Sequence, residues 1–466
     1  MNRTSQNKPI VIIGGGIAGL TAANYLHRRG HNVRLFEAGK QLAGLAQSFH
    51  DPDGFTYDFG AHFITNRLAA AIGVGAQCRD VPRYGETVTL GGKNYGYPFG
   101  LMRIPRFTAS GVATKLKSFT GTEKPASAAE WFRSSYGKAL ADEVAIPLTE
   151  AWSGARAEDL ASSVGDSIPG SIAHTLFLKL AGKFTGRAVA CGYSREMPEK
   201  PSVWHVYPNG GVGVLCEKLA ENLNGAIRLE SPVQAIYVEN NQVAGVRAGG
   251  QDFDAAAVVS TAPAHVLPKL VQGTDALDYL ARFRYRPMVF VNMRFRGRGL
   301  LPDVVTWTPE SSFPFFRLTE TPLSMPWLAP EGKTLITVDI GCEKADEIWQ
   351  MEDEALGEMC LENLLPLVPD ARERYLGSRV LKTPLAYPVF LSEYEADRQK
   401  FEHGTGVENL YSVGRNGEFR HIFMEDAYWR TLRKMQELEQ NLSHGGNKIE
   451  SFSAPPKVQN SVNNWS

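Results

Sequence analysis

Three glycines near the start of the chain have the spacing of a phosphate-binding turn. Gly14, Gly16 and Gly19 form GxGxxG directly after the apolar run PIVII and directly before a helix-like segment, residues 17–29. In such a unit the first glycine permits the tight turn, the second lets the backbone approach a pyrophosphate, and the third lets helix and strand pack closely. The free amides at the start of the helix then bind phosphate. We therefore expect a dinucleotide site here.

An acidic residue follows where a ribose contact is expected. Glu37 ends the second predicted strand, residues 32–36, close to the roughly 20-residue spacing typical of the acid that binds a ribose hydroxyl. Its carboxylate repels a 2′-phosphate, which makes NADP a poor fit. On these residues alone, NAD and FAD both remain open.

The segment after Glu37 distinguishes the two cofactors by resemblance. EAGKQLAGLAQSF resembles the EAxxRxGGxxxS/T segment of the glutathione-reductase-like FAD family. The match includes residues 44–46, whereas Gln41 replaces the usual arginine and Ala43 replaces the first glycine. The resemblance implies that the dinucleotide is FAD.

Later segments extend this resemblance in a fixed order. YDFGAHFI, YPNGGVGVLCEKLAENL, SPVQAI, VVSTAP and NLYSVGRNGEFRHIFMEDA resemble segments of the amine-oxidase, protoporphyrinogen-oxidase and UDP-galactopyranose-mutase group. Because no cysteine follows Cys360, we expect non-covalent FAD. The resemblance implies the following cofactor contacts: Gly14, Gly16, Ile17, Ala18, Gly19, Glu37, Ala38, Gly44, Leu45, Ala46, Gly60, Ala61, His62, Val233, Gly414, Arg415 and Met424.

Three residues are catalytic candidates. The resemblance places His62 over the flavin, where an imidazole can hydrogen-bond the ring or move a proton. Arg317, on a predicted strand in FPFFRLTE, would grip a carboxylate or phosphate, or form a structural ion pair. Tyr387 in AYPVF would line the substrate cavity or pack in the core.

The pattern of predicted elements indicates an α/β fold: a Rossmann-like FAD-binding domain with a second, mixed-sheet substrate domain and a helical cap. We assign residues 8–70, 204–265 and 405–442 to the FAD-binding domain. Residues 71–203 form the helical cap and the first part of the substrate domain, residues 266–404 its sheet, and residues 443–466 a disordered tail. The flavin would lie between the two domains.

The expected function is an FAD-dependent oxidoreductase of the amine-oxidase or protoporphyrinogen-oxidase type, which passes a hydride from a small molecule to flavin N5. Its electron acceptor would be oxygen or an unidentified molecule. A non-redox sugar mutase is the alternative, although Thr65 replaces the second histidine of the mutase motif. The segment RYRPMVFVNMRF likewise contains Arg286 but no lysine in the register that amine oxidases use. A binding protein resembling the Rab GDP-dissociation inhibitors is disfavoured by the intact glycine motif.

Composition limits the partners. A net charge of −1 provides no basic field for nucleic acid, and no apolar run is long enough to span a bilayer. The five cysteines form no CxxC pair, so we expect no metal site. The start of the chain does not resemble a signal peptide, so we expect a cytoplasmic protein. HTLFLKLAGKF, residues 174–184, predicts a buried helix or a shallow membrane contact.

Overall fold

A five-stranded parallel sheet forms the centre of the half that contains the glycine turn. The computed structural model describes residues 8–118, 124–167 and 172–443. The strand order is β10-β2-β1-β14-β21, and every neighbouring pair is parallel. These strands are β1 (Ile10–Ile13), β2 (Val33–Phe36), β10 (Ile227–Arg228), β14 (Ala257–Ser260) and β21 (Leu410–Ser412). The predicted Rossmann-like α/β class is confirmed.

Two layers cover this sheet because its strands are apolar on both faces. Ile10 and Ile12 of β1 pack with helices α1 (Ile17–Arg28), α8 (Gly213–Ala220) and α15 (Met424–Ser443). Val11 and Ile13 pack with a second sheet of order β13-β12-β11-β15. Its strands are β11 (Val233–Glu239), β12 (Gln242–Ala248), β13 (Gln251–Asp254) and β15 (Val271–Gln272).

The second large unit is a seven-stranded mixed sheet with the order β20-β16-β19-β18-β17-β7-β8. All of its pairs are antiparallel except β17 with β7. Helix α11 (Asp353–Leu364) packs on one face. The strands are β7 (Glu86–Leu90), β8 (Lys93–Gly96), β16 (Arg284–Arg296), β17 (Val305–Trp307), β18 (Arg317–Thr319), β19 (Lys333–Gly341) and β20 (Tyr375–Val389).

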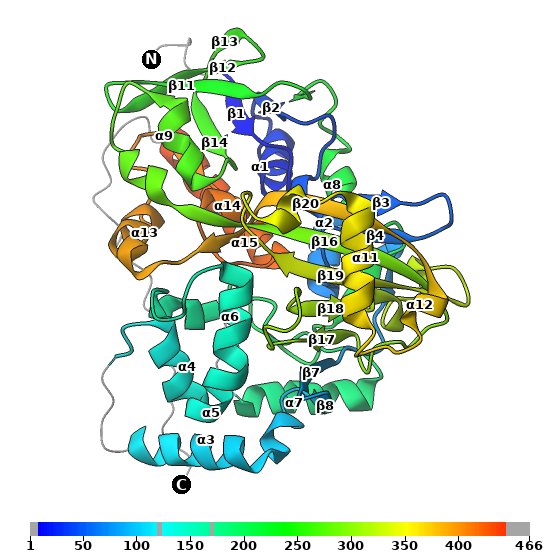
Figure 1. Ribbon diagram of the computed structural model, residues 1–466. Coiled ribbons are helices and arrows are strands. Elements are labelled where there is room, and N and C mark those ends of the chain that lie inside the picture. The colour runs from blue at the N-terminus through cyan, green and yellow to red at the C-terminus, as the bar shows by residue number, and fades with distance from the viewer. Residues whose placement is uncertain (1–7, 119–123, 168–171, 444–466) are drawn as a thin grey trace.

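A group of helices lies at the end of the molecule opposite strands β11 to β13 (Figure 1). These helices are α3 (Pro105–Ser118), α4 (Ala128–Tyr136), α5 (Lys138–Leu140), α6 (Ile146–Ser153) and α7 (Ile172–Thr185). None of the helices in the described ranges is long and apolar enough to cross a membrane.

Two small sheets connect these units. The pair β3 (Ser48–His50) and β4 (Thr56–Asp58) is antiparallel, as the turn at Asp53-Gly54 predicts. A sheet of order β5-β9-β6 follows. The remaining bounds are β5 (Ile64–Thr65), β6 (Cys78–Asp80), β9 (His205–Pro208), α2 (Asn66–Ile72), α9 (Leu267–Leu270), α10 (Glu347–Gln350), α12 (Ala371–Arg374), α13 (Glu395–Glu402) and α14 (Gly414–Gly417).

Two sequence expectations need comment. The helix predicted over residues 174–184 is present as α7, but its predicted burial is wrong at Phe177, Leu180 and Phe184, whose side chains are exposed, whereas Leu178 is buried. The predicted tail, residues 443–466, lies outside the described residues from 444 onward.

A buried carboxylate joins the last two helices. Glu418, at the end of α14, accepts hydrogen bonds from Arg430 Nε (2.9 Å) and the Gly414 amide (3.2 Å), and Lys434 Nζ lies 3.4 Å away. Burial alone would raise the pKa of the Glu418 carboxyl, but Lys434 and Arg430 outweigh it and hold this pKa below its usual range. The charged form of Glu418 therefore stabilises the fold.

Replacing Glu418 with glutamine should lower the free energy of unfolding by about 3 kcal/mol at pH 7, because Lys434 loses its carboxylate neighbour and Arg430 keeps only one of its two carboxylate partners, Glu196. Because the pKa of Glu418 is lower in the folded protein, this contribution exists above its unfolded pKa and fades as the pH falls below about 4.5. Urea unfolding of wild type and Glu418→Gln at several pH values measures the difference, with the exposed Glu437→Gln as control. A difference that stayed constant down to pH 3 would contradict the assignment.

Candidate active site

The glycine turn brings strand, turn and helix into direct contact. Gly14 has a φ of +95°, and a Cβ there would lie 2.1 Å from Thr261 Oγ1. A Cβ on Gly19 would lie 1.9 Å from the Gly14 carbonyl oxygen. At Gly16 the nearest atom to such a Cβ is the Ala43 carbonyl oxygen, 3.9 Å away. Gly16 therefore borders open space, whereas Gly14 and Gly19 border protein.

The start of α1 provides amides for an anion. Leu20 is the first residue whose amide bonds back along the helix, to the Gly16 carbonyl at 2.9 Å, so the preceding amides of Ile17 and Ala18 have no intrahelical partner. The C-terminal segment reaches the same place, because a Cβ on Gly414 would lie 2.8 Å from Ala18 Cβ. A cradle without side chains at the start of a helix fits a pyrophosphate.

The predicted ribose acid closes one side of this cradle. The Glu37 carboxylate accepts from the Gly15 amide (2.6 Å) and the Gly39 amide (2.7 Å). The amide of Ser231 donates to the Glu37 carbonyl oxygen at 2.9 Å, and Val233 begins strand β11 two residues later. The structure thus brings Val233 to the Glu37 end of the cradle.

Ala43 has a backbone conformation that favours glycine. Its φ is +82°, its amide donates to the Gly15 carbonyl at 2.8 Å, and it pairs with Gly16 in an isolated bridge. A left-handed alanine costs on the order of 1 kcal/mol. The neighbouring contacts hold this conformation, and Gly44–Ala46 continue as a short 3₁₀ turn beside the cradle.

His62 lies beside a buried hydrogen-bonded pair. Tyr207 is buried and donates its hydroxyl to Asp58. His62 Nδ1 is 3.8 Å from Asp58 Oδ2 and has no hydrogen-bond partner among the described residues. Just before it, a Cβ on Gly60 would lie 2.9 Å from Phe290 of the seven-stranded sheet. This contact places the His62 segment where the two halves meet.

Arg317 forms a buried ion pair within the seven-stranded sheet. It lies opposite Asp339 in the β18–β19 register and donates to that carboxylate from Nη2. Its guanidinium also lies over the Trp307 ring, with Cζ 5.6 Å from the ring centroid. Burial works to lower the pKa of Arg317, but the charge of Asp339 outweighs it and raises that pKa. Arg317 Nε and Asp339 Oδ1 are buried and have no hydrogen-bond partner in the described structure.

Arg415 is a partly buried cation that has no carboxylate partner among the described residues. Its Nε donates to the Ile422 carbonyl at 3.0 Å, and its Cζ lies 5.5 Å from the centroid of the Tyr387 ring. Arg415 forms no ion pair with any residue in the described ranges. Burial, together with the charge of Arg317, lowers the pKa of Arg415. Such a charge needs an anionic or electron-rich neighbour.

Aromatic side chains from three elements line the space next to Arg415. Tyr387 on β20 lies 5.6 Å from the Trp152 ring and 5.4 Å from the His421 ring, and His421 stacks on Trp152 at 5.2 Å. Burial and the neighbouring Arg415 lower the pKa of His421 to about 3, so this imidazole is neutral at physiological pH. Tyr387 therefore belongs to this aromatic cluster and is partly buried against the core.

A second aromatic group continues from there. Tyr193 stacks on Phe423 with centroids 5.0 Å apart. Glu86 joins two further rings, since it accepts from the Tyr84 hydroxyl at 2.7 Å and from Trp307 Nε1 at 3.0 Å. Sequence reasoning named none of these five as site residues, because they come from four separate segments and form no recognisable motif.

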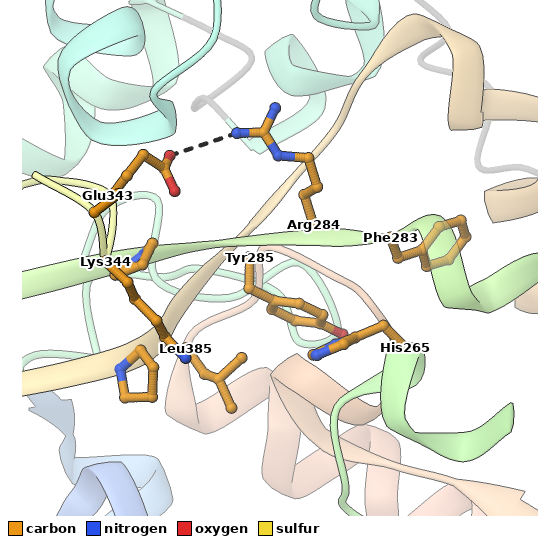
Figure 2. Close-up of a pocket in the computed structure, with 10 residues that line it drawn as sticks. His265, Phe283, Arg284, Tyr285, Glu343, Lys344 and Leu385 are labelled. Atoms are coloured by element: carbon orange, nitrogen blue, oxygen red, sulfur yellow. Dashed lines mark hydrogen bonds and ion pairs between the residues drawn. The ribbon is translucent and has the colours of Figure 1, made fainter. Parts of the chain in front are cut away.

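A separate cavity of about 440 Å³ lies at the edge of β16. Figure 2 shows Tyr285 and His265 on one side of it and the Arg284–Glu343 ion pair on the other. The Tyr285 hydroxyl donates to the Asn416 carbonyl at 2.5 Å, so this cavity lies behind the Arg415 segment. None of the predicted site residues lines it.

A family comparison identifies this arrangement. Residues 17–429 match the model of the family described as flavin containing amine oxidoreductase. The chain belongs to this family. The match confirms the predicted superfamily, the flavin cofactor and the oxidoreductase class, and the glycine cradle is the part of the structure that fits FAD.

Individual relatives are similar over shorter lengths or at lower identity. The chain is 35% identical over 81 residues to an L-amino-acid oxidase of Mus musculus, a stretch that spans 16% of this chain and 13% of that protein. The crystal structure of a reduced UDP-galactopyranose mutase has a TM-score of 0.77 at 19% identity and covers 93% of this chain and 94% of its own. A structure described as a protoporphyrinogen oxidase from Exiguobacterium sp. 255-15 has a TM-score of 0.71 at 18% identity and covers 93% and 99%. These structural likenesses confirm the fold.

Replacing Gly16 with valine should yield a folded protein without FAD. The new side chain has open space, so the fold survives, but it fills the approach of the pyrophosphate. The absorbance spectrum and circular dichroism of the purified variant test this. Gly75→Val is the matched control, because Gly75 also borders open space away from the cradle. A Gly16→Val protein that kept full FAD would show that the pyrophosphate lies elsewhere.

Proposed function

We propose that this protein is an FAD-dependent oxidoreductase whose small-molecule substrate carries an anionic group. The observation that supports it most is the pair of partly buried guanidinium groups, Arg317 and Arg415, which lie close enough for the charge of Arg317 to lower the pKa of Arg415. When bound, FAD supplies the hydride acceptor, N5, and the chain supplies binding, orientation and exclusion of water.

Arg317 is proposed to hold the substrate. One nitrogen, Nη2, bonds Asp339, while Nε has no hydrogen-bond partner among the residues described. The remaining N–H groups of the fork can take a carboxylate or phosphate in bidentate fashion. Asp339 and the Trp307 ring fix the guanidinium, so little side-chain entropy is lost when the anion binds.

The other predicted residues receive roles from their positions. Arg415 is proposed to face the pyrimidine edge of the flavin, where a cation favours added negative charge. Tyr387 packs beside Arg415 and would orient the substrate. His62, with a free Nδ1 beside Asp58, is proposed to contact the cofactor and to move a proton. Non-covalent attachment and a cytoplasmic location remain predictions.

The mutase alternative gains no specific support. Thr65, at the position of the second mutase histidine, is buried, donates to Glu425 Oε2 at 2.9 Å and caps helix α2. Its hydroxyl is thus committed to the fold.

An anaerobic substrate panel tests the proposal. The FAD-loaded protein is mixed with L-amino acids, with the matching amines that lack the carboxylate, and, after reduction by dithionite, with UDP-galactopyranose. We expect loss of the oxidised flavin absorbance with a carboxylate-bearing substrate, and admission of air then reports whether oxygen is the acceptor. Ring contraction of the sugar without substrate oxidation would support the mutase instead.

Replacing Arg317 with lysine should raise KM for the anionic substrate roughly 10- to 100-fold, because lysine keeps the charge beside Asp339 but loses the planar fork. The value of kcat and the KM of a matching neutral substrate should change far less. Arg296→Lys, an exposed change on β16, is the control. If KM for both substrates rose equally, Arg317 would be a structural residue of the sheet.

A further inference from the structure

Exposed apolar side chains are concentrated at one end of the molecule. Of eleven large hydrophobic residues that are exposed in the described chain, only Leu229, Leu376 and Phe423 lie outside residues 97–184. The others are Tyr97, Phe99, Met102, Val112, Leu116, Phe177, Leu180 and Phe184. We call these eight side chains the apolar end face. Single exposed hydrophobics are ordinary, but a contiguous group marks an interaction surface.

Helix α3 has apolar residues on its solvent-exposed face as well as on its buried face. Ala109, Val112, Ala113 and Leu116 are all exposed and follow the i, i+3, i+4, i+7 spacing of one helix face. Phe107 is buried and packs in the core. Solvent-facing helix residues are normally polar, so packing among the described residues does not explain this second stripe.

Helix α7 repeats the arrangement. Phe177, Leu180 and Phe184 are spaced i, i+3, i+7, and Phe184 is 90% exposed, while Leu178 is buried. Figure 1 shows α3 and α7 at the same end of the molecule, away from the nucleotide-binding sheet. The two stripes therefore belong to one end of the molecule.

The charge of these segments is one-sided. Residues 93–118 contain five lysine and arginine residues and no aspartate or glutamate, and residues 172–187 contain three and none, although the whole chain has a net charge of −1. Exposed Arg103 and Lys115 flank the α3 stripe. Two of the cations in these segments pair with acids from other segments: Arg106 bonds Glu143 at 2.6 Å, and Arg187 lies 3.1 Å from Asp80.

We propose that the apolar end face docks on an anionic lipid bilayer. Apolar side chains flanked by basic residues enter the headgroup region, and the cations bind anionic lipids. A second copy of the chain is the poorer occupant, because a symmetric interface would set the same basic segments against each other. The face lies on the membrane, since no described helix is able to span it. This inference does not depend on the substrate or reaction proposed above.

Flotation of the FAD-loaded full chain tests the proposal, with vesicles of phosphatidylcholine alone and of phosphatidylcholine mixed with phosphatidylglycerol. We expect flotation with the anionic vesicles, weaker at high salt, and little with the neutral ones. The double variant Leu116→Ser with Phe184→Ser should lower the bound fraction on the order of ten-fold. The control double variant, Leu229→Ser with Leu376→Ser, also changes two exposed apolar residues and should bind like wild type.

Two results would overturn the inference. One is absence of binding to anionic vesicles, or equal loss of binding in the control. The other is a wild-type dimer in sedimentation velocity that the Leu116→Ser, Phe184→Ser variant converts to a monomer, which would make this face a contact between two copies. Circular dichroism and FAD content confirm that each variant is folded.

Discussion

Close backbone contact at a glycine junction is the constraint on which the rest of the structure depends. Gly14, Gly19 and Gly414 come from the beginning and the end of the chain, and a Cβ on any of them would lie less than 3 Å from another segment. Thr261, which follows β14, completes the junction from the middle of the chain. The pyrophosphate cradle, the Glu37 side and the Arg415 segment keep their relative positions because these segments meet without intervening side chains.

The electrostatics of the candidate site depend on the same junction. Arg317 belongs to a strand of the mixed sheet, whereas Arg415 belongs to a short helix after the last strand of the parallel sheet. Asp339 balances the first charge, but no carboxylate in the described chain pairs with the second. The site thus holds excess positive charge in a poorly hydrated space only when the two halves are assembled, which suits a pocket that takes a negatively charged ligand.

Local signals explain what could be predicted. The strand, glycine turn and helix around Gly14 follow from propensity and spacing that agree with the tertiary structure. The Arg317–Asp339 pair depends on the register of two strands, and no local sequence pattern predicts that register. Strands β7 and β8 join the mixed sheet through pairing with β17, far along the chain. The apolar residues of α7 have the same spacing whether they face the core or the solvent, so the sequence does not predict that Phe184 is exposed.

The strand order also has a consequence for biosynthesis. Strand β1 pairs with β14, whose register begins at Ala257, and β14 pairs with β21 near Leu410. The ribosome makes the chain from its N-terminus, so one edge of β1 stays unpaired until β14 has been made. One edge of β14 then stays unpaired until β21 has been made. Unpaired apolar strands invite aggregation. The nascent protein therefore needs protection through most of its translation, and it can acquire its cofactor only late in that process.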